Sequence, residues 1–253
     1  MTFKLTMIFQ FQFGLLLCFF FSGVVVLGNV EKAIFLGPER TFIPTTPPTL
    51  EDLGLDVLTP GPHRHNWWLR TQLQSSFPTT SDEEPKGGTS TWLLLDNLVQ
   101  GQRYEVRVCW PATQPTAFTL HTYDLQSVWD SPALITSLYN YTMSRQDLLP
   151  DDLITSSIPR SGGEREASVL LLQILSAADY FTHNETLMST VPAVDVDIIL
   201  DPFLLNVLPR SLLPTAGFIV FIAVIAYGLS RRVLAWIQRL SNATEDGQEK
   251  KQQ

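Results

Sequence analysis

An uncharged apolar run close to the C-terminal end places the strongest constraint on how this chain can fold. Residues Leu212 to Ser230 form a stretch of 19 residues without Asp, Glu, Lys or Arg. As an α-helix rising ~1.5 Å per residue, such a run covers ~28 Å, which matches the hydrocarbon thickness of a bilayer. A helix buried in a soluble core would normally carry a polar stripe, and this run has none. The sequence therefore predicts a transmembrane helix at residues 212–230.

The charges that flank this run predict its orientation. Arg231, Arg232 and Arg239 follow it, whereas Arg210 alone lies close before it. Because cations are enriched on the cytosolic side of membrane helices, we expect the tail, residues 231–253, to be cytosolic. Residues 29–211 carry 22 acidic and 11 basic side chains, which disfavours nucleic acid or anionic lipid as a partner of that part.

The N-terminal end has the order of a secretory signal. Lys4 is followed by an apolar stretch from Phe13 to Leu27, and small residues surround a possible cleavage point after Gly28. This pattern predicts a signal peptide at residues 1–28 and a luminal domain at 29–211. The apolar stretch is long for a signal peptide, so an uncleaved signal-anchor is the alternative.

The sequence of the predicted luminal domain indicates a series of short strands. Tyr104, Val106 and Val108 alternate with Glu105 and Arg107, which is the period-2 pattern of a half-buried strand. We expect segments rich in Pro and Gly at 38–62, 75–90 and 150–163 to be loops, and we expect no amphipathic helix between them. The expected strands are 33–36, 66–73, a strand–turn–strand unit over 91–110, 118–125, 169–175 and 194–200. Together they predict a mainly β fold, an antiparallel β-sandwich, followed by one transmembrane helix.

One segment has a more specific pattern. Residues 95–108 read L-x-N-L-x-x-G-x-x-Y-x-V-R-V. This pattern resembles the E–F corner of fibronectin type III domains and related sandwiches, where a Tyr hydroxyl bonds back to the corner backbone. The resemblance predicts that role for Tyr104.

Few residues of the sequence suggest a catalytic or metal-binding site. His63 and His65 could start a metal site, but nothing nearby completes one, so a solvated loop explains them better. Asp195 and Asp197 would project from one face of a strand as catalytic carboxylates do, although a solvent-facing strand edge also explains them. We expect Cys109 to be a buried, inert thiol. Because the sequence shows no nucleophile elbow, phosphate loop or zinc signature, we expect neither an enzyme nor a cofactor.

Short motifs fit the predicted topology. Asn140 and Asn184 begin N-x-T sequons on the luminal side and are expected to be glycosylated, whereas Asn242 would lie in the cytosol and stay unmodified. Lys250 and Lys251 occupy the K-K-x-x positions at the C-terminal end, like a dilysine retrieval signal. These features predict a single-pass type I protein of the endoplasmic reticulum membrane.

The whole layout resembles a fungal family. The segments that carry the resemblance are Glu31–Leu36, Arg103–Pro111 and Asp195–Pro209. They are similar to the accessory subunit, or co-activator, of GPI mannosyltransferase II. The resemblance implies a non-catalytic subunit that supports GPI-anchor biosynthesis, with a multi-span enzyme as partner, which adds the second mannose to the GPI precursor. The alternatives are a luminal binding module, such as a cargo receptor or a membrane-insertion complex subunit, and a stand-alone luminal enzyme.

Overall fold

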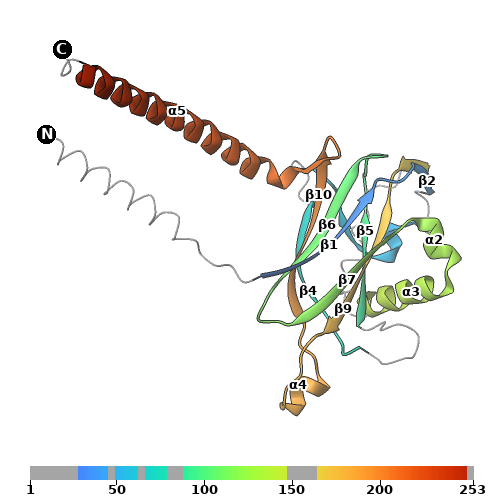
Figure 1. The fold of residues 1–253 in the computed structure, drawn as a ribbon. Helices are drawn as coiled ribbons and strands as arrows, with labels where there is room; N and C mark the ends of the chain where they lie inside the picture. Colours follow the sequence, from blue (N-terminus) through green and yellow to red (C-terminus); the bar gives the residue numbers. More distant parts are fainter. Residues whose placement is uncertain (1–27, 45–48, 62–65, 79–87, 147–163, 250–253) are drawn as a thin grey trace.

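The computed structural model describes residues 28–44, 49–61, 66–78, 88–146 and 164–249. Within them a body built mainly of β-strands is followed by one long helix that extends away from it (Figure 1). The predicted signal peptide up to residue 27, the histidines at 63 and 65, and the lysines at 250 and 251 lie outside the described residues.

The first sheet is centred on two long strands that were both predicted, β6 and β10. Its order is β1–β6–β10–β4, and β11 pairs with the end of β10. All these pairs are antiparallel. The strands are β1 (Gly28–Leu36), β4 (Trp68–Leu73), β6 (Arg103–Pro111), β10 (Val194–Leu204) and β11 (Leu208–Pro209).

The second sheet has the order β3–β5–β9–β7. Here β5, β9 and β7 are antiparallel, whereas the short β3 runs parallel to β5. The strands are β3 (Asp56–Leu58), β5 (Thr89–Leu95), β7 (Thr116–Tyr123) and β9 (Leu170–Ala178), and a separate two-stranded ribbon joins β2 (Thr41–Pro44) to β8 (Glu164–Ala167). The predicted antiparallel sandwich is confirmed, with β3 as an exception. The loop expected at 38–62 is wrong in part, because β2, the short helix η1 (Glu51–Leu53) and β3 lie within it.

The main core fills the space between the two sheets. Alternate residues of β6 and β10 point inward, and Val106, Ile198 and Leu200 are completely buried. They meet side chains of β5 and β9 such as Leu93 and Leu172. The alternation seen in the sequence is therefore the inward face of the first sheet.

A second core on the other face of the second sheet was not predicted. Trp92, Leu94 and Leu171 pack there against the ribbon and against the helices α2 (Leu125–Asp130) and α3 (Pro132–Gln146). The sequence predicts no amphipathic helix here; α2 and α3 are helices, and α3 is not amphipathic. Leu138 of α3 is buried, but apolar residues such as Tyr139 are exposed on its other side, so the sequence shows no amphipathic contrast.

The predicted corner between β5 and β6 is confirmed. The backbone N–H of Val99 donates a hydrogen bond to the Tyr104 hydroxyl at 2.9 Å, and that hydroxyl donates to the Gln102 side chain at 3.0 Å. Burial raises the pKa of Tyr104. Because β5 and β6 belong to different sheets, this contact fixes the chain where it crosses the sandwich.

Removing the corner hydroxyl should have a modest cost. We expect Tyr104→Phe to lower the free energy of unfolding by about 1 kcal/mol, because one net hydrogen bond is lost while the ring stays packed. Denaturant unfolding of the detergent-purified protein measures it. Tyr139→Phe, which changes a Tyr that is 60% exposed, is the matched control. Equal unfolding curves for the two variants would contradict the role of the hydroxyl.

The C-terminal helix α5 (Leu213–Glu249) contains the predicted apolar run. Residues Arg210–Arg239 contain an apolar segment long enough to cross a membrane, and that segment is not buried against the rest of the protein. The other short helices are η3 (Arg210–Leu212), which precedes α5, and α4 (Glu185–Ser189) at the opposite end of the body (Figure 1).

A carboxylate ties the sheet to the start of this helix. The backbone N–H of Ser211 in η3 lies 3.1 and 3.3 Å from the two carboxylate oxygens of Asp201 in β10. Arg107 of β6 donates to the Ser211 hydroxyl at 3.4 Å. Side-chain contacts therefore hold η3, the segment that leads directly into α5, against the first sheet.

Candidate binding recess

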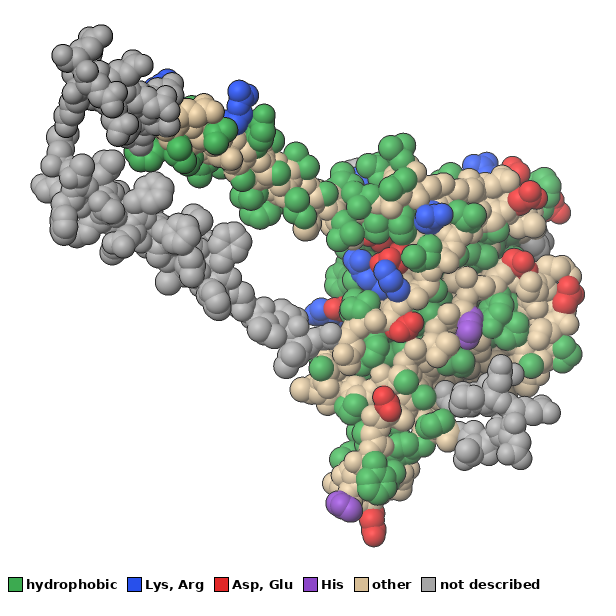
Figure 2. Space-filling model, in the orientation of Figure 1, with side chains coloured by type: hydrophobic (Ala, Val, Ile, Leu, Met, Phe, Trp, Pro, Cys, Tyr) green, Lys and Arg blue, Asp and Glu red, His purple; other side chains and the backbone are tan. Residues whose placement is uncertain are grey.

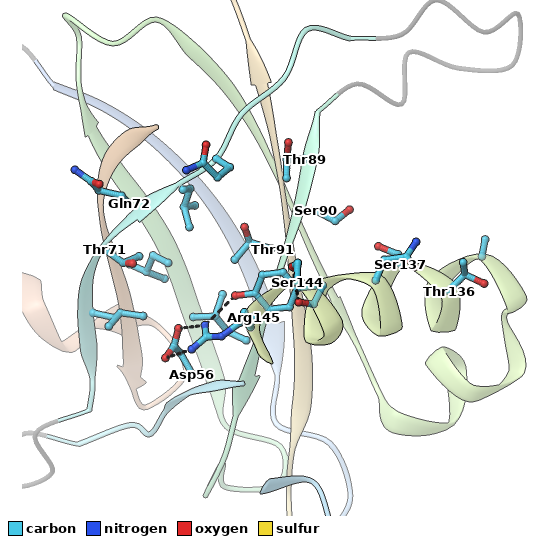
Figure 3. Close-up of a pocket in the computed structure, with 18 residues that line it drawn as sticks. Asp56, Thr71, Gln72, Thr89, Ser90, Thr91, Thr136, Ser137, Ser144 and Arg145 are labelled. Carbon is cyan, nitrogen blue, oxygen red and sulfur yellow. Dashed lines mark hydrogen bonds and ion pairs between the residues drawn. The ribbon is translucent and has the colours of Figure 1, made fainter. Parts of the chain in front are cut away.

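A recess of about 890 Å³ opens between β4, β5 and α3. Figure 3 shows its side chains coming from these three elements. Most of them carry hydroxyl or amide groups: Thr71, Gln74, Thr89, Ser90, Thr91, Thr136, Ser137, Asn140 and Ser144 line the recess, and Gln72 lines it while its amide binds Asp195 outside. The recess therefore offers many neutral hydrogen-bonding groups.

The recess opens where, within the described residues, the two sheets have no further strand along this side. β4 is an edge strand of the first sheet. β3 pairs only with Leu93–Leu95, so the first half of β5 has no strand on that side within the described part of the chain. Free strand edges can form main-chain hydrogen bonds with another extended segment.

A charged pair closes one end of the recess. Arg145 of α3 binds Asp56 of β3 through two hydrogen bonds, of 2.5 and 3.2 Å (Figure 3). The same guanidinium donates to the Tyr141 hydroxyl at 3.0 Å. The bond to Asp56 raises the pKa of Arg145, and burial raises that of Tyr141. The Asp56 carboxylate is therefore held in a two-point ion pair with Arg145.

Ser137 holds α3 against the second sheet and so fixes the wall of the recess. Its hydroxyl accepts hydrogen bonds from the indole N–H of Trp92 at 3.1 Å and from the Gln173 amide at 3.4 Å. The Gln173 amide also donates to Ser90 at 3.2 Å. Trp92 and Gln173 are buried and Ser90 and Ser137 are half-buried, so this network makes the recess a preformed feature of the fold.

The two predicted carboxylates lie outside the recess. Asp195 and Asp197 project from the outer face of the first sheet, but β10 is an interior strand, so the predicted edge position is wrong. Arg70 binds Asp197 at 2.7 and 2.8 Å and lowers its pKa. Gln72 donates to Asp195 at 2.9 Å. Both carboxylates therefore form hydrogen bonds with side chains of β4.

The remaining predicted residues are spread over the surface. Cys109 is half-buried rather than fully buried, and desolvation raises the pKa of its thiol, which favours the unreactive form. Asn140 is exposed on α3 at the recess. Asn184 is exposed at the start of α4, where its side chain accepts a hydrogen bond from the backbone N–H of Thr186 at 3.0 Å. Glycosylation of either residue stays a prediction, and Asn242 lies within α5.

The chain is similar to a protein of Schizosaccharomyces pombe named GPI mannosyltransferase 2 subunit C167.09. The two are 43% identical over 49 residues, which is 19% of this chain and 28% of the relative. The resemblance predicted from the sequence is confirmed, and the match spans little more than a quarter of the relative's length. No family model and no solved structure matches the chain.

Proposed function

We propose that this protein is a non-catalytic accessory subunit of an endoplasmic-reticulum GPI mannosyltransferase and supports GPI-anchor biosynthesis. The observation that carries the proposal is the similarity to the fission yeast subunit, whose name states that it is part of GPI mannosyltransferase 2. The partner would be the multi-span enzyme that transfers the second mannose.

The helix α5 supports a partnership within the membrane. Its apolar segment is exposed on every side in the structure, so it has no partner within the described chain. Small residues, including Gly217, Ala223 and Gly228, would let another helix approach closely. A single span of this kind is suited to lateral packing on a larger membrane protein.

The recess supports a second contact on the luminal side. An extended segment of the partner could bind along the free edges of β4 and β5, with the hydroxyl and amide groups binding its backbone. Asp56, the acidic side chain of the recess, is held by Arg145. The protein would thus bind and stabilise the enzyme without taking part in the sugar transfer.

The proposal includes a topology. Residues 1–28 would be the signal peptide, 29–211 the luminal domain, 212–230 the span and 231–253 the cytosolic tail. Lys250 and Lys251 would return the protein to the endoplasmic reticulum. The cations at 231, 232 and 239 after the apolar run support this orientation.

Glycosylation tests the topology directly. We expect Asn140→Gln and Asn184→Gln each to remove one endoglycosidase-sensitive mobility shift, because both side chains are exposed on the proposed luminal side. Asn242→Gln, the internal control, should change nothing. A shift that disappears with Asn242→Gln would reverse the orientation.

Depletion of the protein tests the function. We expect a GPI precursor bearing a single mannose to accumulate and GPI-anchored surface proteins to decrease, because the second mannose would no longer be added. Metabolic labelling of GPI intermediates measures this. Intermediates identical to those of the parent strain would refute the assignment.

Rescue variants then test the recess. Ser144→Trp places a large ring in the recess at an exposed position of α3, whereas Ser189→Trp makes the same change on α4, away from it. Only the first should fail to restore mannosylation and to co-purify with the mannosyltransferase. Full rescue by both variants would mean that the recess does not bind the enzyme.

The second candidate function is a luminal binding module for another cargo, and the recess is the observation that favours it. Co-purification of tagged protein from membranes separates the two. Capture of a mannosyltransferase supports the first function, and capture of a secretory cargo without it supports the second.

A further inference from the structure

The hairpin between β10 and β11 exposes apolar side chains next to the membrane helix. We call residues Leu204 to Val207 the hairpin tip. Leu204, Leu205 and Val207 are 49%, 88% and 78% exposed. Figure 2 shows hydrophobic side chains gathered over this end of the body, beside the start of α5.

The conformation of the tip makes Leu205 unexpected. Leu205 and Asn206 have φ values of 52° and 59°, and the Val207 N–H donates to the Leu204 carbonyl at 3.1 Å. A β-turn whose two central residues both have positive φ favours Asn and Gly at these positions. A Leu there costs about 1 kcal/mol in backbone strain and also exposes its side chain to water.

Asn206 has a clear structural role in the turn, whereas Leu205 has none inside the domain. The Asn206 side chain accepts a hydrogen bond from the Arg103 backbone N–H at 2.8 Å and donates to the Gly101 carbonyl at 3.0 Å. These contacts hold the tip against the β5–β6 corner. Leu205 points outward with most of its surface uncovered, which indicates a contact with something outside the domain.

The fold places the tip next to the start of the apolar helix α5. Leu205 precedes the first residue of α5 by eight positions. Pairing of Leu204 with Leu208 and the contact between Asp201 and Ser211 hold the intervening segment against the first sheet. Because the apolar run begins at the first turn of α5, this end of the body lies at the level of the lipid headgroups.

We propose that the hairpin tip inserts into the interfacial region of the membrane that α5 spans, with phospholipid as its partner. Leu204, Leu205 and Val207 would contact the upper acyl chains, while Arg103 and Arg210 on either side bind lipid phosphates. The domain then has a second attachment point beside its span, which fixes its rotation about the helix axis. The inference requires α5 to span the membrane and is independent of the mannosyltransferase partnership.

The test uses an environment-sensitive dye on the full-length protein reconstituted alone into phosphatidylcholine vesicles. NBD is attached at Leu205→Cys after Cys18 and Cys109 have been changed to Ser. We expect blue-shifted emission that loses about half its intensity with phosphatidylcholine spin-labelled near the headgroup. Phe181→Cys is the matched control, since Phe181 is an apolar residue 81% exposed before α4, at the other end of β10. Its label should emit as in water and resist quenching.

Other results would overturn the inference. A Leu205 label that behaves like the Phe181 label would show that the tip stays in water. A blue shift that appears only with a co-reconstituted mannosyltransferase, without lipid quenching, would show that the tip binds protein. Leu205→Asn should leave the melting temperature in detergent unchanged or higher, and a clear decrease would show that Leu205 packs within the domain.

Discussion

Val106→Asp should prevent the β-rich body of the protein from folding. Val106 has no exposed surface and lies in the middle of β6, between Ala33 of β1 and Leu200 of β10. An ionised carboxylate there would have no partner in the main core, and the cost should exceed about 4 kcal/mol. Since the total stability of a domain is about 5–15 kcal/mol, this single change removes much or all of it.

The fluorescence of the buried tryptophans reports whether the Val106→Asp protein folds. Trp92 is fully buried and Trp110 almost so, and unfolding should shift their emission to the red. Val99→Asp introduces the same charge at a residue that is 53% exposed in the β5–β6 corner, and it should keep the native emission. A Val106→Asp protein with native emission and an unchanged melting curve would show that this face of β6 is not the core.

Gly88→Ala should have the second largest effect, because Gly88 meets two constraints at once. Its φ is +116°, which L-residues rarely adopt, and an added Cβ would collide with the backbone of Ser176 and Ala177 in β9. Neither strand can move easily, since Thr89 pairs directly with Ser176. We expect a loss of about 3 kcal/mol or more, with strain and collision both contributing.

Gly101→Ala separates these two causes. Gly101 has a φ of +73° but no atom within 4 Å of an added Cβ, so only the strain remains. The expected cost is about 1 kcal/mol. Thermal unfolding of both variants in the same detergent measures the difference. Equal losses would mean that β9 does not approach Gly88 closely.

The sequence predicted the strands whose two faces have different surroundings. Tyr104, Val106 and Val108 face the core while Glu105 and Arg107 lie on the other face of the sheet, so apolar and charged residues alternate along β6, although Glu105 is itself buried. Trp92 to Leu95 are all buried because β5 is covered on both faces. That continuous apolar run was a signal for a third layer. The layer was missed because exposed apolar residues on α3, such as Tyr139, hide its periodicity.

The recess could not be predicted from local patterns. Its walls come from Thr71, Thr91 and Ser137, which are far apart in the sequence and are brought together by the pairing of β4 with β10 and by the packing of α3. Taken alone, a hydroxyl residue at position 71, 91 or 137 is typical of any strand or loop. The opening itself depends on how short β3 is, and that length has no sequence marker.

The position of β6 in the first sheet determines when this sheet can fold during synthesis of the chain. β6 lies between β1, which is made early, and β10, which directly precedes α5. While the chain is being synthesised, one edge of β6 stays open until β10 leaves the ribosome, when the exit tunnel already holds the apolar helix. Pairing over such separations is slow, and open edges aggregate meanwhile. The first sheet can therefore close only after β10 has been made, when synthesis has already reached α5.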